Sequence, residues 1–257
     1  MRAHALLPLF LLVTGCVGST GGDLFTFEAT ASGPVSSDGG SYSFESGRGY
    51  AVTLTRARVH VGAVYLNRSL ATSVASDTSC TLAGIYVAEV TTGLDVDALS
   101  PDPQPFPELG QGTADQAYTG EVWLTSGDVN AESDPRVVLD VAGTAERGGA
   151  TYAFEAELSI GSNRVDPPQN PALPGAKPIC KQRIVTPIPV NVVPTRGGRL
   201  ALRIDPAGFF GNVDFSTLSA SPDGVFRFDD VSATQASANL YAGLRASTGA
   251  YHFEFEP

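Results

Sequence analysis

Apolar and polar residues alternate with a period of two along much of the chain. The clearest case is residues 151–160, where Tyr152, Phe154, Ala156, Leu158 and Ile160 alternate with polar or small residues. The same alternation is present at residues 199–205, 226–229 and 251–256. Strict alternation is typical of a strand with one face in the core and the other in solvent. The pattern therefore predicts antiparallel sheets with one buried face.

Glycine pairs between such segments predict turns. Two hairpins are expected, each with a glycine pair in its connection: residues 136–146 with 151–160, and residues 184–193 with 200–204. Glycine supplies the positive φ that tight hairpin turns require. Further strands are predicted at residues 24–29, 50–66, 82–90 and 117–125.

Helical signals are few. Asp205-Pro206 predicts one short helical turn before Phe209, and Ser232–Gln235 resembles a capping box ahead of residues 236–244. The latter segment is either a single helix or another strand. We therefore predict an all-β fold, an antiparallel β-sandwich or a partly open barrel, with at most one or two short helices.

Two long proline-rich segments interrupt the predicted strands, at residues 100–109 and 166–178. Loops of this length are commonly binding loops or ordered crossings. We interpret both as loops of a single domain that spans residues 24–257, although either is also suited to link two domains.

Composition narrows the classes of partner. The chain has 257 residues, 27 acidic and 16 basic side chains and a formal net charge of −11. Binding to nucleic acid depends on a basic surface that displaces counterions from phosphate. The acid excess therefore argues against a nucleic-acid partner.

The first residues have the features of an export signal. Arg2 precedes an apolar run from Ala5 to Val13, and small residues follow it. This run is shorter than the ~20 residues that a membrane-spanning helix needs. We therefore expect residues 1–15 to be a cleaved signal peptide, with residues 16–23 as a flexible tether.

Val13-Thr14-Gly15-Cys16 resembles the lipobox of bacterial lipoproteins. The resemblance implies that cleavage falls before Cys16 and that Cys16 is acylated, so that its lipid holds the protein on a bilayer at the cell envelope. Val17 stands where an aspartate is associated with inner-membrane retention, which favours the outer membrane. The alternative is an ordinary signal peptide with a cysteine near its cleavage site.

Two cysteines remain after Cys16, namely Cys80 and Cys180. A pair of cysteines in an exported protein favours a disulfide. Two separate thiols are the alternative, because only proximity in the fold decides.

Arg56, Arg58 and His60 alternate along one predicted strand, so their side chains are expected on one face. Such a ridge suits an anion, because arginine matches the geometry of carboxylate or phosphate. The alternative is cross-strand pairing with acidic neighbours such as Glu155 and Glu157.

Metal ligands are sparse. His60, His252 and Glu254 are candidate ligands for copper or zinc, provided that the two strands carrying the histidines pair. Oxygen ligands for Ca²⁺ are offered by aspartate-rich turns, although these residues are also common turn formers: Asp95, Asp97, Asp128, Asn130, Asp134, Asp229 and Asp230. We therefore expect no bound cofactor, with calcium as the alternative.

Signals for catalysis are weak. Glu155 with Glu157, and Glu254 with Glu256, have the spacing of the two carboxylates of an inverting glycosidase, but alternation produces such pairs on any solvated strand. The common serine-nucleophile motifs are absent from the sequence. Trp123, the tyrosines and the phenylalanines are either a sugar-stacking platform or part of the core.

Thr55–Leu66 and the later hairpins resemble uncharacterised exported β-sandwich lipoproteins and, more distantly, the copper-associated proteins of the MbnP type. The chain has three histidines and one methionine, fewer than a copper site of that type implies. We therefore expect an anchored envelope lipoprotein with a non-catalytic binding, adhesion or structural role toward an envelope protein or glycan. The alternatives are a metal-handling protein that binds calcium or copper and a glycan-active hydrolase.

Overall fold

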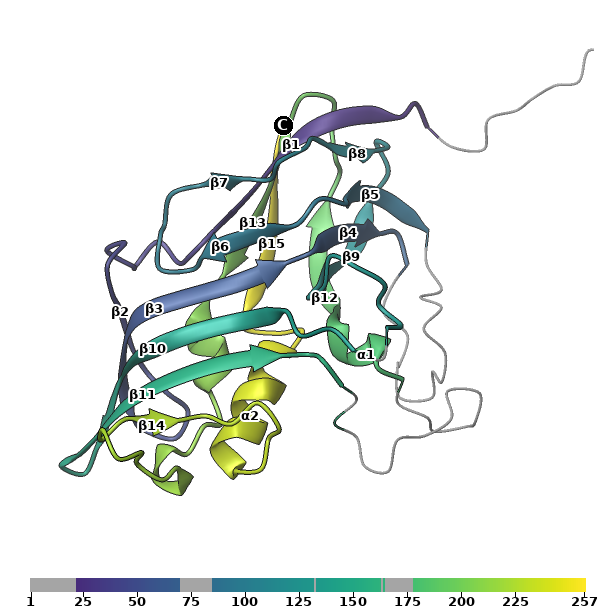
Figure 1. The fold of residues 1–257 in the computed structure, drawn as a ribbon. Coiled ribbons are helices and arrows are strands. Elements are labelled where there is room, and N and C mark those ends of the chain that lie inside the picture. The colour runs from purple at the N-terminus through teal and green to yellow at the C-terminus, as the bar shows by residue number, and fades with distance from the viewer. Residues whose placement is uncertain (1–21, 70–84, 132, 163, 165–177) are drawn as a thin grey trace, which may run out of the picture.

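The structure is a computed structural model that describes residues 22–69, 85–131, 133–162, 164 and 178–257. Two β-sheets dominate it, one of them curled into a nearly closed barrel, so the prediction of an all-β fold is confirmed (Figure 1). Helices are short and few in this part of the chain: α1 (Cys180–Arg183), α2 (Gln235–Leu244) and the 3-10 turns η2 (Pro206–Phe210) and η3 (Phe215–Thr217).

The larger sheet has nine strands and the smaller has six. In spatial order the larger contains β12 (Ile184–Val192), β9 (Ala117–Trp123), β4 (Ala63–Asn67), β5 (Tyr86–Val90), β8 (Gly110–Gly112), β1 (Phe25–Ser32), β13 (Arg199–Ile204) and β15 (Tyr251–Glu256), with β7 (Gln104–Pro105) also paired to β1. The smaller contains β14 (Phe226–Arg227), β11 (Ala150–Ser159), β10 (Val137–Arg147), β3 (Ala51–Val61) and β2 (Tyr42–Glu45), with β6 (Leu94–Asp97) also paired to β3.

The alternation along β11 places one face in the core, as predicted. Phe154, Ala156 and Leu158 are buried, whereas Glu157 is exposed. Phe154 packs against Phe215, with 4.9 Å between ring centroids. Buried residues of both sheets belong to one continuous hydrophobic core. The hydrophobic effect therefore holds the two sheets together.

One of the two predicted hairpins forms. β10 and β11 pair along their whole length, and Gly148 and Gly149 have φ of 59° and 82° in the turn between them. The predicted hairpin of residues 184–193 with 200–204 is wrong, because β12 pairs with β9 while β13 lies between β1 and β15. Proline lacks the N–H that a central strand must donate, so Pro187 and Pro189 suit β12 to the edge position that it occupies.

The strand predicted over residues 50–66 is divided at Gly62. Its first part is β3 in the smaller sheet, and its second part is β4 in the larger sheet. Gly62 donates its N–H to the Trp123 carbonyl at 2.7 Å. A Cβ at this position would lie 1.8 Å from the Thr125 carbonyl oxygen. Glycine therefore permits the close crossing at which the chain changes sheets.

Both helical signals correspond to helices. Asp205 caps η2 by accepting a hydrogen bond from Ala207 N–H at 2.9 Å. Residues 236–244, for which the sequence left helix and strand open, form most of the helix α2. Its N-cap is Thr234 rather than Ser232, and the Thr234 hydroxyl accepts a hydrogen bond from Ser237 N–H at 3.1 Å. Ser232 has a φ of 60°, so it belongs to the turn that leads into the helix.

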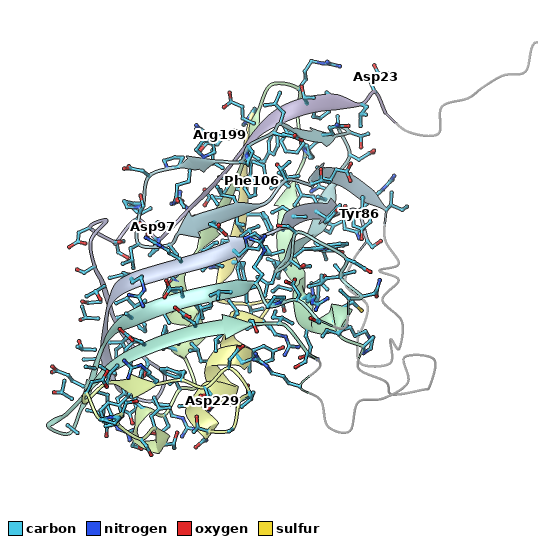
Figure 2. All side chains as sticks on the ribbon, viewed as in Figure 1. Asp23, Tyr86, Asp97, Phe106, Arg199 and Asp229 are labelled. Atoms are coloured by element: carbon cyan, nitrogen blue, oxygen red, sulfur yellow. The ribbon has the colours of Figure 1, made fainter. Side chains whose placement is uncertain are left out.

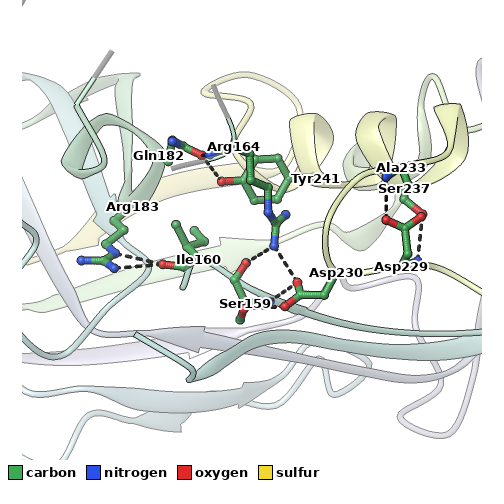
Figure 3. Close-up of polar contacts among 10 residues, drawn as sticks. All are labelled: Ser159, Ile160, Arg164, Gln182, Arg183, Asp229, Asp230, Ala233, Ser237 and Tyr241. Atoms are coloured by element: carbon green, nitrogen blue, oxygen red, sulfur yellow. Dashed lines mark hydrogen bonds and ion pairs between the residues drawn. The ribbon is translucent and has the colours of Figure 1, made fainter. Parts of the chain in front are cut away.

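Arg164 fastens α2 to the smaller sheet (Figure 3). Its Nη2 donates to the Ser159 carbonyl of β11 at 2.5 Å and lies 2.6 Å from Asp230 Oδ1, and its guanidinium lies 3.9 Å from the ring centroid of Tyr241. The Tyr241 hydroxyl donates to Gln182 Oε1 at 2.5 Å. These contacts join β11, α1 and α2 at one corner of the molecule.

The first proline-rich segment is an ordered crossing. Phe106, labelled in Figure 2, is only 7% exposed, and its N–H donates to the Ala29 carbonyl at 2.9 Å. The second segment, like the predicted signal peptide and most of the tether, lies outside the described residues. Within the described ranges, none of the helices has the length and apolarity needed to cross a bilayer.

Candidate functional site

A serine, a histidine and an aspartate meet where the chain crosses between the sheets. His60 Nδ1 lies 2.6 Å from Asp95 Oδ1, and His60 Nε2 lies 2.7 Å from Ser126 Oγ. The imidazole is only 5% exposed, whereas the Asp95 side chain is 74% exposed and Ser126 is exposed. We call these three residues the Ser126 triad.

The fold itself aligns the Ser126 triad. Asp95 on β6 lies directly opposite His60 on β3 in the sheet register. Ser126 follows β9 and is held beside His60 by the close approach of Gly62 to Thr125. A Cβ on Gly93 would lie 2.5 Å from Ser126 Oγ, so a glycine there leaves room for the hydroxyl.

The hydrogen bonds fix the protonation of the histidine ring. A carboxylate only accepts hydrogen bonds, so the neutral form of His60 has its proton on Nδ1 and presents the lone pair of Nε2 to the Ser126 hydroxyl. An arrangement of this kind increases the nucleophilicity of serine.

A surface cavity of about 340 Å³ lies beside Ser126. Small and charged residues line it: Ser126, Gly127, Asp128, Ala131, Ser133, Asp134 and Arg136. The Thr125 hydroxyl donates to Asp134 Oδ2 at 2.8 Å, which ties the far wall to the strand end that carries Ser126. The loop that lines the cavity is therefore joined to the strand end that carries Ser126.

Three aromatic rings form a row on the outer face of the larger sheet. Tyr65 on β4 lies 4.9 Å from the ring of Tyr86 on β5 and 4.9 Å from that of Trp123 on β9, centroid to centroid. Tyr86, labelled in Figure 2, is 40% exposed, and the other two rings are half-buried. We call these rings, with Glu121 and Glu89, the aromatic patch. Trp123 therefore lies on the outward phase of its strand.

The two carboxylates of the aromatic patch differ in exposure. Glu121 is 3% exposed beneath the rings and accepts a hydrogen bond from Trp123 Nε1 at 3.2 Å. Burial raises the pKa of Glu121 above its ordinary value, against the opposing effect of hydrogen bonds from Trp123, Asn67 and Tyr86. Glu89 is exposed and lies opposite Tyr65 in the register of β4 and β5. The patch thus offers flat apolar faces beside an accessible acceptor.

Replacing Glu121 with glutamine is expected to stabilise the fold at pH 7 and to have little effect near pH 4. With its pKa raised, folded Glu121 holds its proton at pH values where the unfolded chain has released it, so stability is lost as pH rises through the folded-state pKa. Glutamine does not titrate and removes that loss. Thermal unfolding at the two pH values measures the effect, with Glu89→Gln as the exposed control. A Glu121→Gln variant less stable than wild type at pH 7 would contradict the argument.

The predicted anion ridge is not a row of three exposed cations. Arg56 forms an ion pair with Asp140 at 2.7 Å, and His60 is buried between Asp95 and Ser126. Arg58 is exposed and lies opposite Asp97 and Asp140 in the register. Acidic residues of neighbouring strands thus surround the cations, in line with the cross-strand alternative, although the partner of Arg56 is Asp140 rather than Glu155 or Glu157.

The proposed pairing of the two histidines for a metal site is wrong. His60 is on β3 of the smaller sheet, whereas His252 is on β15, which pairs with β13 in the larger sheet. Glu254 lies 3.5 Å from Arg203 in an ion pair. In the part of the chain that the structure describes, three or more histidine, cysteine or acidic groups do not gather at any metal-binding position.

The aspartate-rich turns use their carboxylates locally. Asp128 accepts from Asn130 N–H at 2.9 Å, Asp97 accepts from Leu99 N–H at 3.0 Å, and Asp229 accepts from Ala233 N–H at 2.6 Å (Figure 3). These bonds are typical of turn-forming aspartates. Asp95 and Asp230 bond instead to His60 and Arg164, and only Asp128 and Asp134 share a cavity, so in the described ranges the residues proposed for calcium do not form a cluster of three or more.

The paired glutamates do not face each other across a cleft. Glu155 and Glu157 line a surface cavity of about 340 Å³ together with Arg56 and Arg227, and Glu155 lies 3.5 Å from Arg227. Glu256 forms an ion pair with Arg199. Each pair therefore has an arginine at salt-bridge distance rather than a second carboxyl group across a cleft.

Cys180 is buried at the start of α1. Its expected partner, Cys80, lies outside the described residues, so the disulfide stays a prediction.

Sequence reasoning missed the Ser126 triad. Ser126 lacks a nucleophile motif around it, and the alternation assigned His60 to the exposed ridge with the arginines.

Comparison of the chain with protein-family models, with curated proteins and with solved structures found no match.

Proposed function

We propose that the protein is a lipid-anchored glycan-binding protein of the bacterial cell envelope. The aromatic patch is the observation that carries the binding role. Three rings span three adjacent strands, and neighbouring centroids are 4.9 Å apart. A sugar ring has apolar C–H faces that pack on aromatic rings, while its hydroxyls need hydrogen-bond partners such as Glu89.

Charge narrows the class of glycan. The exposed carboxyl group of Glu89 lies beside the rings, and the whole chain has a formal net charge of −11. Both features repel an acidic polysaccharide, since like charges are disfavoured at close range. The ligand that fits best is therefore a neutral or amino-substituted glycan.

The anchor is the lipid on Cys16. Attachment by acyl chains is stable when more than one chain is present. The short tether of residues 16–23 would keep the aromatic patch near the bilayer surface. Val17 and the lipobox support placement at the outer membrane.

The chain offers a direct reporter of binding, because Trp123 is the sole tryptophan. Neutral, amino-substituted and uronic-acid tetrasaccharides are titrated into the detergent-solubilised full chain. We expect a saturable change in tryptophan emission with the first two classes. Tyr65→Ala should weaken binding about fivefold or more, if a stacked sugar contributes ~1–3 kcal/mol as a base stacked on an aromatic side chain does.

Tyr118→Ala is the matched control, since Tyr118 is 41% exposed on the same strand but points to the opposite face from Trp123. An equal loss of affinity in both variants would contradict glycan binding at the aromatic patch. An emission change with choline but with none of the glycans would contradict a glycan as the ligand. In the same cells, Cys16→Ser should move the binding activity from the membrane fraction to the soluble fraction. Retention of this variant in the membrane fraction would contradict the anchor.

A further inference from the structure

We propose that the Ser126 triad is a hydrolytic centre that cleaves esters of short acyl chains. This activity goes beyond glycan binding and rests on different residues. Two hydrogen bonds join the three side chains in the order carboxylate, imidazole and hydroxyl, at 2.6 and 2.7 Å. A base must lie within hydrogen-bond reach of the proton that it removes, and these distances satisfy that requirement.

The histidine of the Ser126 triad is buried, and its serine is exposed, as an activated nucleophile requires. The His60 ring is packed in place with Gly93 against one edge, so its orientation toward Ser126 is fixed. Ser126 is exposed and opens onto the cavity of about 340 Å³, so a substrate can reach Oγ. A buried base next to an accessible hydroxyl is the geometry expected of an activated serine.

The cavity limits the acyl group. Ala131 and Ser133 are small, and Asp128 and Asp134 are charged, so the wall offers little apolar surface to a long hydrocarbon chain. An acetyl group fits this wall better than a fatty acyl group does.

The exposure of Asp95 favours esters over amides. At 74% exposure, this carboxylate stabilises a positively charged His60 less than a buried carboxylate would, because water screens the interaction. An amide nitrogen must be protonated before it leaves, whereas an alcohol leaves more readily. Ser126 is therefore activated less strongly than a serine in a triad with a buried carboxylate, which suits the more reactive ester.

The reaction balances with water as the co-reactant. Ser126 Oγ bonds to the acyl carbon while its proton passes to His60 Nε2, and the acyl–oxygen bond of the ester breaks. The leaving alkoxide takes the proton from Nε2. Water then attacks the acyl-serine, with His60 as the base, and releases the carboxylic acid as Ser126 regains its proton.

The experiment uses the detergent-solubilised full chain and two probes. A fluorophosphonate should label Ser126, as located by peptide mass spectrometry, and p-nitrophenyl acetate should be hydrolysed faster than p-nitrophenyl octanoate. Ser126→Ala and His60→Gln should each lower hydrolysis at least 100-fold and abolish the label. Asp95→Asn should lower kcat with KM unchanged, since Asp95 acts through His60 as a positioning residue.

Ser43→Ala is the matched control. Ser43 is an exposed serine on β2, in the sheet that carries His60, and its hydroxyl lies 2.8 Å from another hydroxyl, that of Thr53, rather than from a base. This variant should keep both the label and the hydrolysis. The proposal is overturned if folded wild-type protein carries no adduct at Ser126, or if Ser126→Ala hydrolyses the acetate as fast as wild type. The adduct is located at Ser126 by mass spectrometry, whereas glycan binding is measured from the emission of Trp123, so the two tests can fail independently.

Discussion

Replacing Arg183 with alanine is expected to lower the free energy of unfolding by about 3–5 kcal/mol. Its guanidinium is fully buried, and burial lowers its pKa from the ordinary value. Nε and Nη2 donate to the Ile160 carbonyl at 3.2 and 3.0 Å, and Nη1 donates to the carbonyls of Asp128 and Val129 at 3.1 and 3.2 Å (Figure 3 shows the Ile160 bonds). Alanine would leave these three carbonyl groups without the donors and would create a cavity.

Urea denaturation of the full chain measures the effect of Arg183→Ala. Lys181→Ala is the control, because Lys181 is on the same short helix and is only half-buried. We expect the control to change stability by less than about 1 kcal/mol. Equal shifts in the two variants would show that the buried guanidinium does not hold this corner together. Arg183→Lys should lie between the two, because an ammonium keeps the charge but lacks the planar fork.

Replacing Gly62 with alanine is expected to destabilise the protein by roughly 3 kcal/mol or more. The new Cβ would lie 1.8 Å from the Thr125 carbonyl oxygen and 2.6 Å from the Ser126 nitrogen. Both atoms belong to the backbone, so the clash cannot be relieved by a change of rotamer. The strands β3 and β4 would have to separate from the end of β9.

Thermal unfolding of Gly62→Ala is best compared with that of Gly127→Ala. At Gly127 the nearest atom to a new Cβ would be Thr125 Oγ1, at 4.0 Å, which is an ordinary contact. This control should stay within about 1 kcal/mol of wild type. If Gly62→Ala is as stable as the control, the close crossing is not required for the fold.

Local patterns predicted what depends on neighbours in sequence. The alternation of residues 151–160 identified the buried face of β11, and the two glycines identified its turn. The strand that pairs with β12 was not predictable from local patterns. The two prolines of β12 indicate only that it is an edge strand. Which strand accepts it depends on packing across the whole sheet.

The candidate sites show the same limit. His60 is separated from Asp95 by 35 positions and from Ser126 by 66, and only sheet pairing brings them together. Glu121 and Trp123 share a face because they are two residues apart. That Tyr65 lies opposite Glu121 follows from the register of β4 with β9, which a single sequence does not reveal.

The prolines of β12 also bear on self-association. An open strand edge is a template on which another copy can add its own strand. Pro187 and Pro189 remove two donors from this edge, and β15, at the other end of the sheet, packs beside β12. If a lipid on Cys16 holds the protein on a membrane, as we propose, neighbouring molecules would meet often, and the missing donors at this edge would keep those encounters from growing into fibrils.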